Sequence, residues 1–208
     1  MIFKDRATAA DLLSDELKAY KDIKNGIIIG LPRGGVVTAA IIAKALNLPL
    51  DVICPRKIRA PFNAEFALGS VTINDIGYLN EELIEALLVS DAYLKKEIEE
   101  RQIEARSRLK TYRKNKLPLD LKNKTVILVD DGLATGATIM AAISEVKKSK
   151  ATRVIVAIPI ASPDALKLVK NKVDDFVCLY SSPAFYTVGQ FYENFDQTED
   201  AEVIKLLE

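Results

Sequence analysis

The sequence predicts an α/β fold in which a twisted, mostly parallel sheet is flanked by helices and covered by a small hood. Short apolar runs, typical of buried strands, alternate along the chain with amphipathic stretches of helical length. This alternation is typical of βαβ units, which bring successive strands together in one parallel sheet. Of the 208 residues, 49% are hydrophobic, enough for one sizeable core. We therefore expect a single domain over residues 1–208.

The strands are predicted from short apolar runs that are rich in β-branched residues and have no polar alternation. Runs of this kind lie at residues 26–30, 50–54, 126–129, 154–160 and 173–180. An apolar run without alternation indicates a strand that is buried on both faces, as in a sheet with helices on each side. We expect these runs to form the central sheet.

The helices are predicted from apolar residues that recur at intervals of three and four positions. Such patterns lie at residues 8–20, 36–46, 81–89, 91–112 and 139–146, and another begins near Ser162. Thr8 and Asp11 resemble a capping box for the first helix, while Asn47 and Pro49 end the second. The charged helix at 91–112 is expected to be solvated, with a dimer contact or a nucleic-acid contact as the alternatives.

Two segments do not match the central sheet. Residues 56–80 alternate poorly and contain Pro61, Gly69 and Gly77, which predicts a flexible loop with a hairpin. The tail after about residue 181 is rich in aromatic side chains. We expect both segments to form the hood over the strand ends.

Composition excludes several classes of function. Lys plus Arg and Asp plus Glu are 29 each, so no net charge draws the chain to nucleic acid or to an anionic membrane. No apolar run approaches the roughly 18 residues that span a bilayer, and no signal-peptide core is present at the N-terminus, so a cytoplasmic protein is expected. The chain has no histidine, which excludes Ser–His–Asp catalysis and His-ligated metals. Cys54 and Cys178 lie in apolar runs and are predicted to be core residues.

The most specific pattern is the segment 126–138, Val-Ile-Leu-Val-Asp-Asp-Gly-Leu-Ala-Thr-Gly-Ala-Thr. Its apolar strand runs into Asp130 and Asp131, at the carboxyl end where open α/β sheets bind their ligands. The small residues and hydroxyls of 132–138 then open the next helix. Backbone N–H groups at a helix N-terminus suit a phosphate, and paired carboxylates accept hydrogen bonds from vicinal hydroxyls. The pattern predicts a site for a ribose that carries a 5-phosphate.

This segment resembles the thirteen-residue phosphoribosyl-pyrophosphate (PRPP) signature of the type I phosphoribosyltransferases. The resemblance implies that Asp130 and Asp131 hold the ribose hydroxyls. It assigns the 5-phosphate to a loop that consists of Gly132, Ala134, Thr135, Gly136, Ala137 and Thr138. It also implies a Mg²⁺ cofactor, held mainly by PRPP with Asp130 as the candidate protein ligand, and a homodimer.

The turn at residues 30–35, Gly-Leu-Pro-Arg-Gly-Gly, joins the first strand to the second helix. Its glycines let the backbone approach an anion closely, and Arg33 adds a fork of donors suited to phosphate oxygens. On its own the turn is also typical of an ordinary tight turn. Beside the 126–138 segment it resembles the pyrophosphate loop of the family, which implies binding by Pro32, Arg33, Gly34 and Gly35. Family members often have a cis non-proline peptide in this loop, here at Pro32–Arg33.

Three charged residues follow the second strand and are candidates for the chemistry. Arg56 and Lys57 leave the same edge of the sheet as the two loops and are expected to meet the pyrophosphate, unless they are solvated cations. Glu65 lies in a loop that could close over the site, and it is the candidate for proton transfer at the attacking nitrogen. A surface glutamate is the alternative. The hypoxanthine-type enzymes of the family carry an acid at the position of Ala134, whereas the adenine-type enzymes carry alanine there. The resemblance to the adenine-type enzymes favours Glu65 as the proton-transfer residue.

Five of the fourteen aromatic residues lie within eleven positions near the C-terminus. They are Phe185, Tyr186, Phe191, Tyr192 and Phe195. One of them could stack on a planar base, for which Phe185 and Tyr186 are the candidates. The alternative is that the aromatic residues attach the tail to the sheet.

The reaction implied by the resemblance is transfer of the phosphoribosyl group from Mg²⁺-bound PRPP to a nitrogen acceptor, such as a nucleobase, with release of pyrophosphate. A PRPP-binding regulator with little or no turnover is the main alternative, and a hydrolase or phosphorylase acting on a ribose phosphate is a weaker one. The segments 56–69 and 188–192 look like those of a subgroup of predicted phosphoribosyltransferases whose acceptor is not settled. No motif in the sequence identifies the acceptor.

Overall fold

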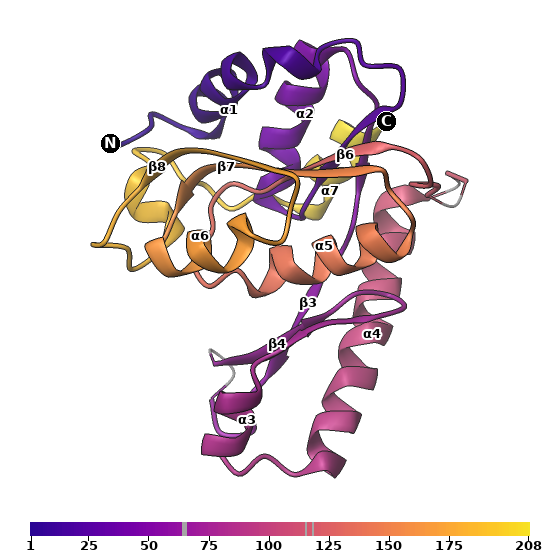
Figure 1. Cartoon of the computed structure of the whole chain (residues 1–208), viewed down its shortest axis with the longest axis vertical. Helices are drawn as coiled ribbons and strands as arrows, with labels where there is room; N and C mark the ends of the chain where they lie inside the picture. The colour runs from indigo at the N-terminus through magenta and orange to yellow at the C-terminus, as the bar shows by residue number, and fades with distance from the viewer. Residues whose placement is uncertain (64–65, 115, 118) are drawn as a thin grey trace.

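Five parallel strands form the central sheet of the protein. Figure 1 shows a computed structural model of the whole chain. The structure describes residues 1–63, 66–114, 116–117 and 119–208. The strands are β1 (Gly26–Gly30), β2 (Leu50–Val52), β6 (Thr125–Val129), β7 (Arg153–Ala161) and β8 (Asp175–Ser181). They lie in the order β2-β1-β6-β7-β8, and each neighbouring pair is parallel. The predicted fold class is confirmed.

Helices cover both faces of this sheet (Figure 1). On one face lie α1 (Arg6–Glu16), followed by the 3₁₀ turn η1 (Lys18–Tyr20), and α2 (Gly34–Leu46). On the other face lie α5 (Ala137–Lys148) and α6 (Pro163–Lys170). Side chains alternate between the two faces along each strand, so Ile28 packs with α1 and α2 whereas Ile27 and Ile29 pack with α5. Burial on both faces explains the continuous apolar runs.

The strand order places a topological switch point between β1 and β6. From β1 the chain crosses through α2 to β2, and from β6 it crosses through α5 to β7 on the opposite side. The connections after β1 and β6 therefore leave the sheet in opposite directions. Open α/β sheets bind their ligands at such a switch point.

A second, smaller sheet lies below α5 in Figure 1. It is antiparallel and consists of β3 (Arg56–Arg59), β4 (Ala67–Val71) and β5 (Ile76–Leu79), followed by α3 (Glu81–Ala86) and the long α4 (Asp91–Arg113). A side chain at Gly77 would place its Cβ 2.1 Å from the Cα atom of Ala141 in α5, so the two elements are in direct contact. Where the sequence predicted a flexible loop with a hairpin, three strands pair and pack on α5.

The C-terminal segment returns to the N-terminal end of the chain. It contains the 3₁₀ turn η2 (Val188–Phe191) and α7 (Asp200–Leu207). The backbone N–H of Phe3 donates to the carbonyl of Phe191 at 2.7 Å, and the ring of Phe3 lies 5.5 Å from that of Tyr192. The C-terminal segment is therefore attached next to the start of α1.

The first helix begins earlier than the sequence predicted. Its N-cap is Asp5, whose Oδ1 accepts a hydrogen bond from the backbone N–H of Thr8 at 2.8 Å, so the predicted capping box at Thr8 is wrong. Both cysteines are free thiols: Cys54 is buried, and Cys178 is half-buried. Among the described residues, no helix is both long enough and apolar enough to cross a membrane.

Candidate active site

The two acids of the 126–138 segment lie at the carboxyl end of β6, at the switch point of the sheet. The backbone N–H of Asp131 donates to Oδ1 of Asp130 at 2.9 Å, which holds the two carboxylates side by side. Burial raises the pKa of Asp130 well above its usual range, and the charge of Asp131 raises it further. Burial also raises the pKa of Asp131, whereas the Arg6 guanidinium lowers it. The site thus holds two acidic groups together in a poorly solvated place.

The glycine turn after β1 packs directly against these acids. A Cβ atom at Gly35 would lie 2.7 Å from Oδ1 of Asp130. A Cβ atom at Gly34 would lie 1.9 Å from Oδ2 of Asp131, well inside the distance that real Cβ atoms show. Only glycine leaves room for the acids at both positions, so the two loops predicted to bind the sugar and the pyrophosphate are in contact.

The peptide bond between Pro32 and Arg33 is cis, as the resemblance implied. Arg33 is the N-cap residue of α2, and its side chain is 28% exposed. Its Nη1 lies 3.8 Å from a carboxylate oxygen of Asp200 and 3.9 Å from one of Glu199, at the start of α7. In this structure the Arg33 guanidinium is therefore directed toward α7.

The predicted phosphate loop leads from Asp131 into α5. Gly136 is the N-cap residue of that helix and has a φ of 81°, a left-handed conformation that glycine adopts at little cost. The Oγ of Ser162 donates to the carbonyl of Ala134 at 2.6 Å, and the backbone N–H of Leu133 donates to the carbonyl of Ile160 at 2.8 Å. The loop is thus anchored to the end of β7, and it leads into the first turn of α5, where helix N–H groups suit an anion.

A cavity of about 270 Å³ lies between the glycine turn and the small sheet. It is lined by Pro32, Pro55, Arg56, Lys57, Arg59, Arg101 and Thr138. We call it the cationic cavity, because four of these side chains are positively charged. Burial and the nearby arginines, Arg108 and Arg101, lower the pKa of Arg56 to about 10, so Arg56 stays charged at neutral pH. Arg56 forms an ion pair with Glu104 of α4.

A second cavity, of about 550 Å³, lies on the outer side of the phosphate loop. It is lined by Ala134, Thr135, Ser162, Asp164, Ala165, Leu168, Phe185 and Tyr186. We call it the outer cavity. It is open to solvent, and it combines apolar surface with a carboxylate and two aliphatic hydroxyl groups.

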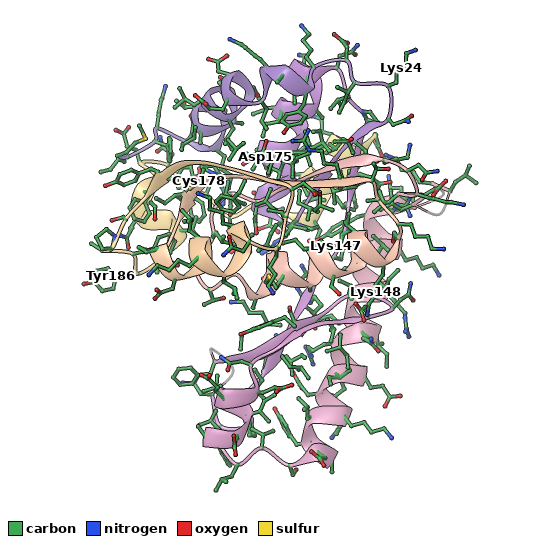
Figure 2. The ribbon with its side chains drawn as sticks, viewed as in Figure 1. Lys24, Lys147, Lys148, Asp175, Cys178 and Tyr186 are labelled. Atoms are coloured by element: carbon green, nitrogen blue, oxygen red, sulfur yellow. The ribbon has the colours of Figure 1, made fainter. Side chains whose placement is uncertain are left out.

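The aromatic residues of the C-terminal segment divide into two groups. The ring of Phe185 lies 5.2 Å from that of Phe191, and the rings of Tyr192 and Phe195 are stacked at 5.0 Å. These four attach the segment to the rest of the fold. Tyr186 is different, because its side chain is 86% exposed and lies at the periphery of the molecule in Figure 2. Tyr186 is the most exposed of the five aromatic side chains.

The structure brings together most of the predicted site residues, in three neighbouring groups. The acids lie with Gly34 and Gly35. Pro32, Arg56, Lys57 and Thr138 line the cationic cavity, and Ala134, Thr135, Phe185 and Tyr186 line the outer cavity. Gly132 packs against Val188, and a Cβ atom there would lie 2.4 Å from its Cγ1. Ala137 begins α5. Glu65, the predicted proton-transfer residue, lies outside the described residues.

Four residues near the site were not selected from the sequence. They are Arg6, Arg59, Arg101 and Tyr192. Arg101 follows Glu97 at i,i+4 spacing on α4, a pattern that is typical of a solvated helix. No sequence signal therefore assigns Arg101 to a site. Arg6 carries a weak signal: a cation in the first turn of a helix faces the positive end of the helix dipole, and it needs a compensating acid elsewhere.

Comparisons with known proteins agree with this geometry. Residues 3–195 match the family model of the phosphoribosyl transferase domain. A protein of Mycobacterium tuberculosis (strain H37Rv), whose name assigns it provisionally to the phosphoribosyl transferases, is 36% identical over 208 residues, 100% of this chain. The chain spans about half the length of this curated relative, 46%.

Solved structures show a similar fold. A protein from Thermus thermophilus is 37% identical and superposes with a TM-score of 0.82, over 100% of this chain and 98% of that one. The purine phosphoribosyltransferase of Pyrococcus horikoshii is 21% identical with a TM-score of 0.52, over 93% and 92% of the two chains, which is a likeness of fold. Because the family model covers nearly the whole chain, this protein belongs to the phosphoribosyltransferase family.

Proposed function

We propose that this chain transfers the phosphoribosyl group of PRPP to a nitrogen acceptor and releases pyrophosphate. The observation that carries the proposal is the contact between the acid pair, Asp130 and Asp131, and the glycine turn at Gly34 and Gly35. Vicinal hydroxyls need paired acceptors, and a pyrophosphate needs backbone donors and cations. The paired carboxylates and the backbone of the glycine turn lie within a few ångströms of each other at the switch point of the sheet, next to a helix N-terminus suited to the 5-phosphate.

In this proposal the acids hold the sugar while the bond from C1 to the pyrophosphate oxygen breaks and a bond from C1 to the acceptor nitrogen forms. Positive charge grows on the ribose in the transition state, and negative charge grows on the departing pyrophosphate. The buried carboxylates favour the first charge, and the side chains of Arg56 and Lys57 favour the second. Thr138, in the loop that we assign to the 5-phosphate, lines the cationic cavity together with Arg56 and Lys57. The 5-phosphate and the leaving group would therefore bind at opposite ends of one continuous site.

The residues present suit the Mg²⁺ ion that the family generally uses. The carboxylates of Asp130 and Asp131 outnumber the one guanidinium, of Arg6, that pairs with them among the described residues. Mg²⁺ prefers oxygen ligands and is commonly held by one or two carboxylates together with substrate phosphates. PRPP would hold most of the coordination sphere, with Asp130 as the protein ligand. When bound, the ion would neutralise charge on the pyrophosphate.

For the acceptor we propose the outer cavity. Its exposed Tyr186 offers a ring face for stacking, and Asp164 and the hydroxyl of Ser162 offer polar contacts. A planar heterocycle would match these groups, and its stacking on the aromatic ring would contribute about 1–3 kcal/mol. We further propose that Glu65 takes the proton from the attacking nitrogen. These assignments rest on the lining of the cavity and on the resemblance to the family.

Replacing Asp131 by Asn is the direct test of the proposed function. Release of pyrophosphate from Mg²⁺-bound PRPP would be measured with a panel of nucleobases and related heterocycles. We expect one acceptor to support release, and turnover to fall at least about tenfold in Asp131→Asn, because a charge-assisted hydrogen bond is lost at the sugar. Asp51→Asn is the matched control, since Asp51 is 11% exposed and forms a similar ion pair, with Arg113, outside the site.

The other outcomes separate the alternatives. Unchanged kinetics in Asp131→Asn would remove the acid pair from the mechanism. Binding of PRPP by calorimetry, without pyrophosphate release for any acceptor, would instead identify a PRPP-binding regulator.

We also propose a homodimer. Large apolar side chains are exposed in the connections of the small sheet and its helices, with Phe62, between β3 and β4, at 91% and Leu88, between α3 and α4, at 90%. Such side chains gain free energy when a partner covers them. Light scattering coupled to size-exclusion chromatography measures the mass directly, and a mass near 22.9 kDa, that of one chain, would contradict the dimer.

A further inference from the structure

Arg6, the first residue of α1, forms an ion pair with Asp131, from which it is separated by 125 positions in sequence. Its Nε donates to Oδ2 of Asp131 at 2.7 Å. The two side chains are only 12% and 14% exposed, so the pair is largely shielded from solvent. A pair in this environment is stronger than a surface ion pair, because water screens it less.

The rest of the Arg6 guanidinium is held by the C-terminal segment. Its Nη1 donates to the backbone carbonyl of Asp196 at 2.8 Å, and its central carbon lies 3.9 Å from the centre of the Phe195 ring. The hydroxyl of Tyr192 donates to the backbone carbonyl of Asp131 at 2.6 Å. Arg6 and Tyr192 therefore attach the same segment, residues 192–196, to the second acid of the pair.

The glycine turn completes the enclosure of this carboxylate. A Cβ atom at Gly34 would lie 2.8 Å from Nε of Arg6 and 1.9 Å from Oδ2 of Asp131. The Asp131 carboxylate is thus confined between the turn on one side and the guanidinium on the other. Arg6 also lies at the N-terminal end of α1, where the helix dipole disfavours a cation. This position is unfavourable for α1 by itself and is compensated by Asp131 and the Phe195 ring.

We propose that Arg6 is a positioning residue for sugar recognition, which fixes the Asp131 carboxylate and connects it to the C-terminal segment 192–196. The guanidinium engages Oδ2, and Oδ1 is the oxygen that we assign to a ribose hydroxyl. This inference rests on the proposed function, because it assigns Asp131 to the ribose of PRPP. It adds that the first turn of α1 and residues 192–196 determine how well that acid is aligned.

A double-mutant cycle on Arg6 and Asp131 tests the inference. Binding of Mg²⁺-bound PRPP would be measured by calorimetry for the wild-type protein, Arg6→Gln, Asp131→Asn and the double variant. We expect Arg6→Gln to weaken binding about tenfold, because a charge-assisted hydrogen bond that aligns the acid is lost. We expect the double variant to bind no more weakly than Asp131→Asn alone, since residues that act through one another are not additive.

Two further variants separate alignment from folding. Arg113→Gln is the matched control, because Arg113 and Asp51 form an equally shielded pair at 3.0 Å, each 11% exposed, outside the site. It should lose stability while its PRPP affinity changes by less than about twofold. Arg6→Lys retains the charge but not the planar fork of donors, and it should recover part of the affinity lost in Arg6→Gln. If Arg6→Gln does not fold, Arg6→Lys still tests the inference. Its affinity for PRPP should lie between those of the wild type and Asp131→Asn.

The failures are distinguishable. Wild-type affinity in a folded Arg6→Gln or Arg6→Lys variant, or additive losses in the double variant, would overturn the inference and leave the proposed function intact. Absence of PRPP binding by the wild-type protein would overturn both.

Discussion

The two sides of the candidate site are formed in different ways. On the acid side, Asp130 and Asp131 touch the glycine turn so closely that a single Cβ atom would collide with them. On the other side, the cationic cavity is lined by long side chains from β3 and α4, and its Arg56 is paired with Glu104. The first side is set by backbone geometry at the ends of two parallel strands. The second depends on how the small sheet packs against α5.

This difference indicates how each side responds to a ligand. The acids have little room to move, so the sugar would meet carboxylates that are already in place, which reduces the cost of ordering on binding. The cations have longer side chains and acidic partners, such as Glu97, whose carboxylate lies 3.2 Å from Nε of Arg101. Pyrophosphate would have to compete with these acids. We therefore expect changes on the acid side to affect both turnover and PRPP affinity, and changes on the cationic side to affect mainly PRPP affinity.

The largest effect is expected from Gly34→Ala. The added Cβ would lie 1.9 Å from Oδ2 of Asp131, so the carboxylate or the turn must shift. A displacement of about 1 Å at a reacting centre can reduce the rate about hundredfold, and we expect a loss of kcat of that order. Steady-state release of pyrophosphate at saturating PRPP measures it.

Gly77→Ala is the matched control for this change. Its Cβ would lie 2.1 Å from the Cα atom of Ala141, where the small sheet meets α5. It should lower the melting temperature more than Gly34→Ala does, with a smaller loss of kcat. Equal losses of kcat in Gly34→Ala and Gly77→Ala would show that the acid side and the cationic side are not independent.

The acid side could be predicted from sequence because its signals are local. The apolar run 126–129 predicts a buried strand, and the position of Asp130 and Asp131 directly after it places them at the ligand-binding edge. The small residues that follow predict the loop and the start of α5. Parallel pairing then brings the turn at 30–35 to the same edge. The sequence thus predicted the elements and the common edge of the sheet, whereas the contact between the two loops is seen only in the structure.

The other features depend on contacts between residues that are distant in sequence. Arg101 already has acidic partners at helical spacing on α4, so its sequence neighbours explain its charge without a site. The strands of the small sheet are short, and Gly69 and Gly77 weaken their pattern although close packing requires them. At Gly69, a Cβ atom would lie 2.2 Å from the carbonyl oxygen of Tyr78. Neither the role of Arg101 nor the strands of the small sheet can be recognised before the tertiary contacts are known.

An intermediate effect is expected from Arg56→Gln on the cationic side. Loss of one half-buried cation should raise the KM for PRPP about tenfold, since a charge-assisted contact to phosphate contributes about 1.5–3 kcal/mol. The value of kcat should also fall, but by a smaller factor, because the pyrophosphate group of bound PRPP already carries most of the negative charge that Arg56 would contact. Arg153→Gln is the control, because Arg153 pairs with Asp175 at the amino ends of β7 and β8, at the opposite edge of the sheet from the site. A large fall in kcat at unchanged KM would mean that Arg56 acts mainly in the transition state, and that this side also arranges the reacting groups.

The smallest effect on activity is expected from Ser70→Ala, which tests whether the two sides are coupled. The Oγ of Ser70 in β4 donates to the carbonyl of Ala137, the first residue of α5, at 2.5 Å, and both groups are buried. Removal of this hydrogen bond should lower the free energy of unfolding by about 1 kcal/mol, measured by urea denaturation. The carbonyl of Ala137 keeps its place in the first turn of α5, so PRPP affinity should be nearly unchanged. If affinity instead fell in step with the loss of stability, the small sheet would determine the shape of the phosphate loop, and the cationic cavity and the phosphate site would form one cooperative unit.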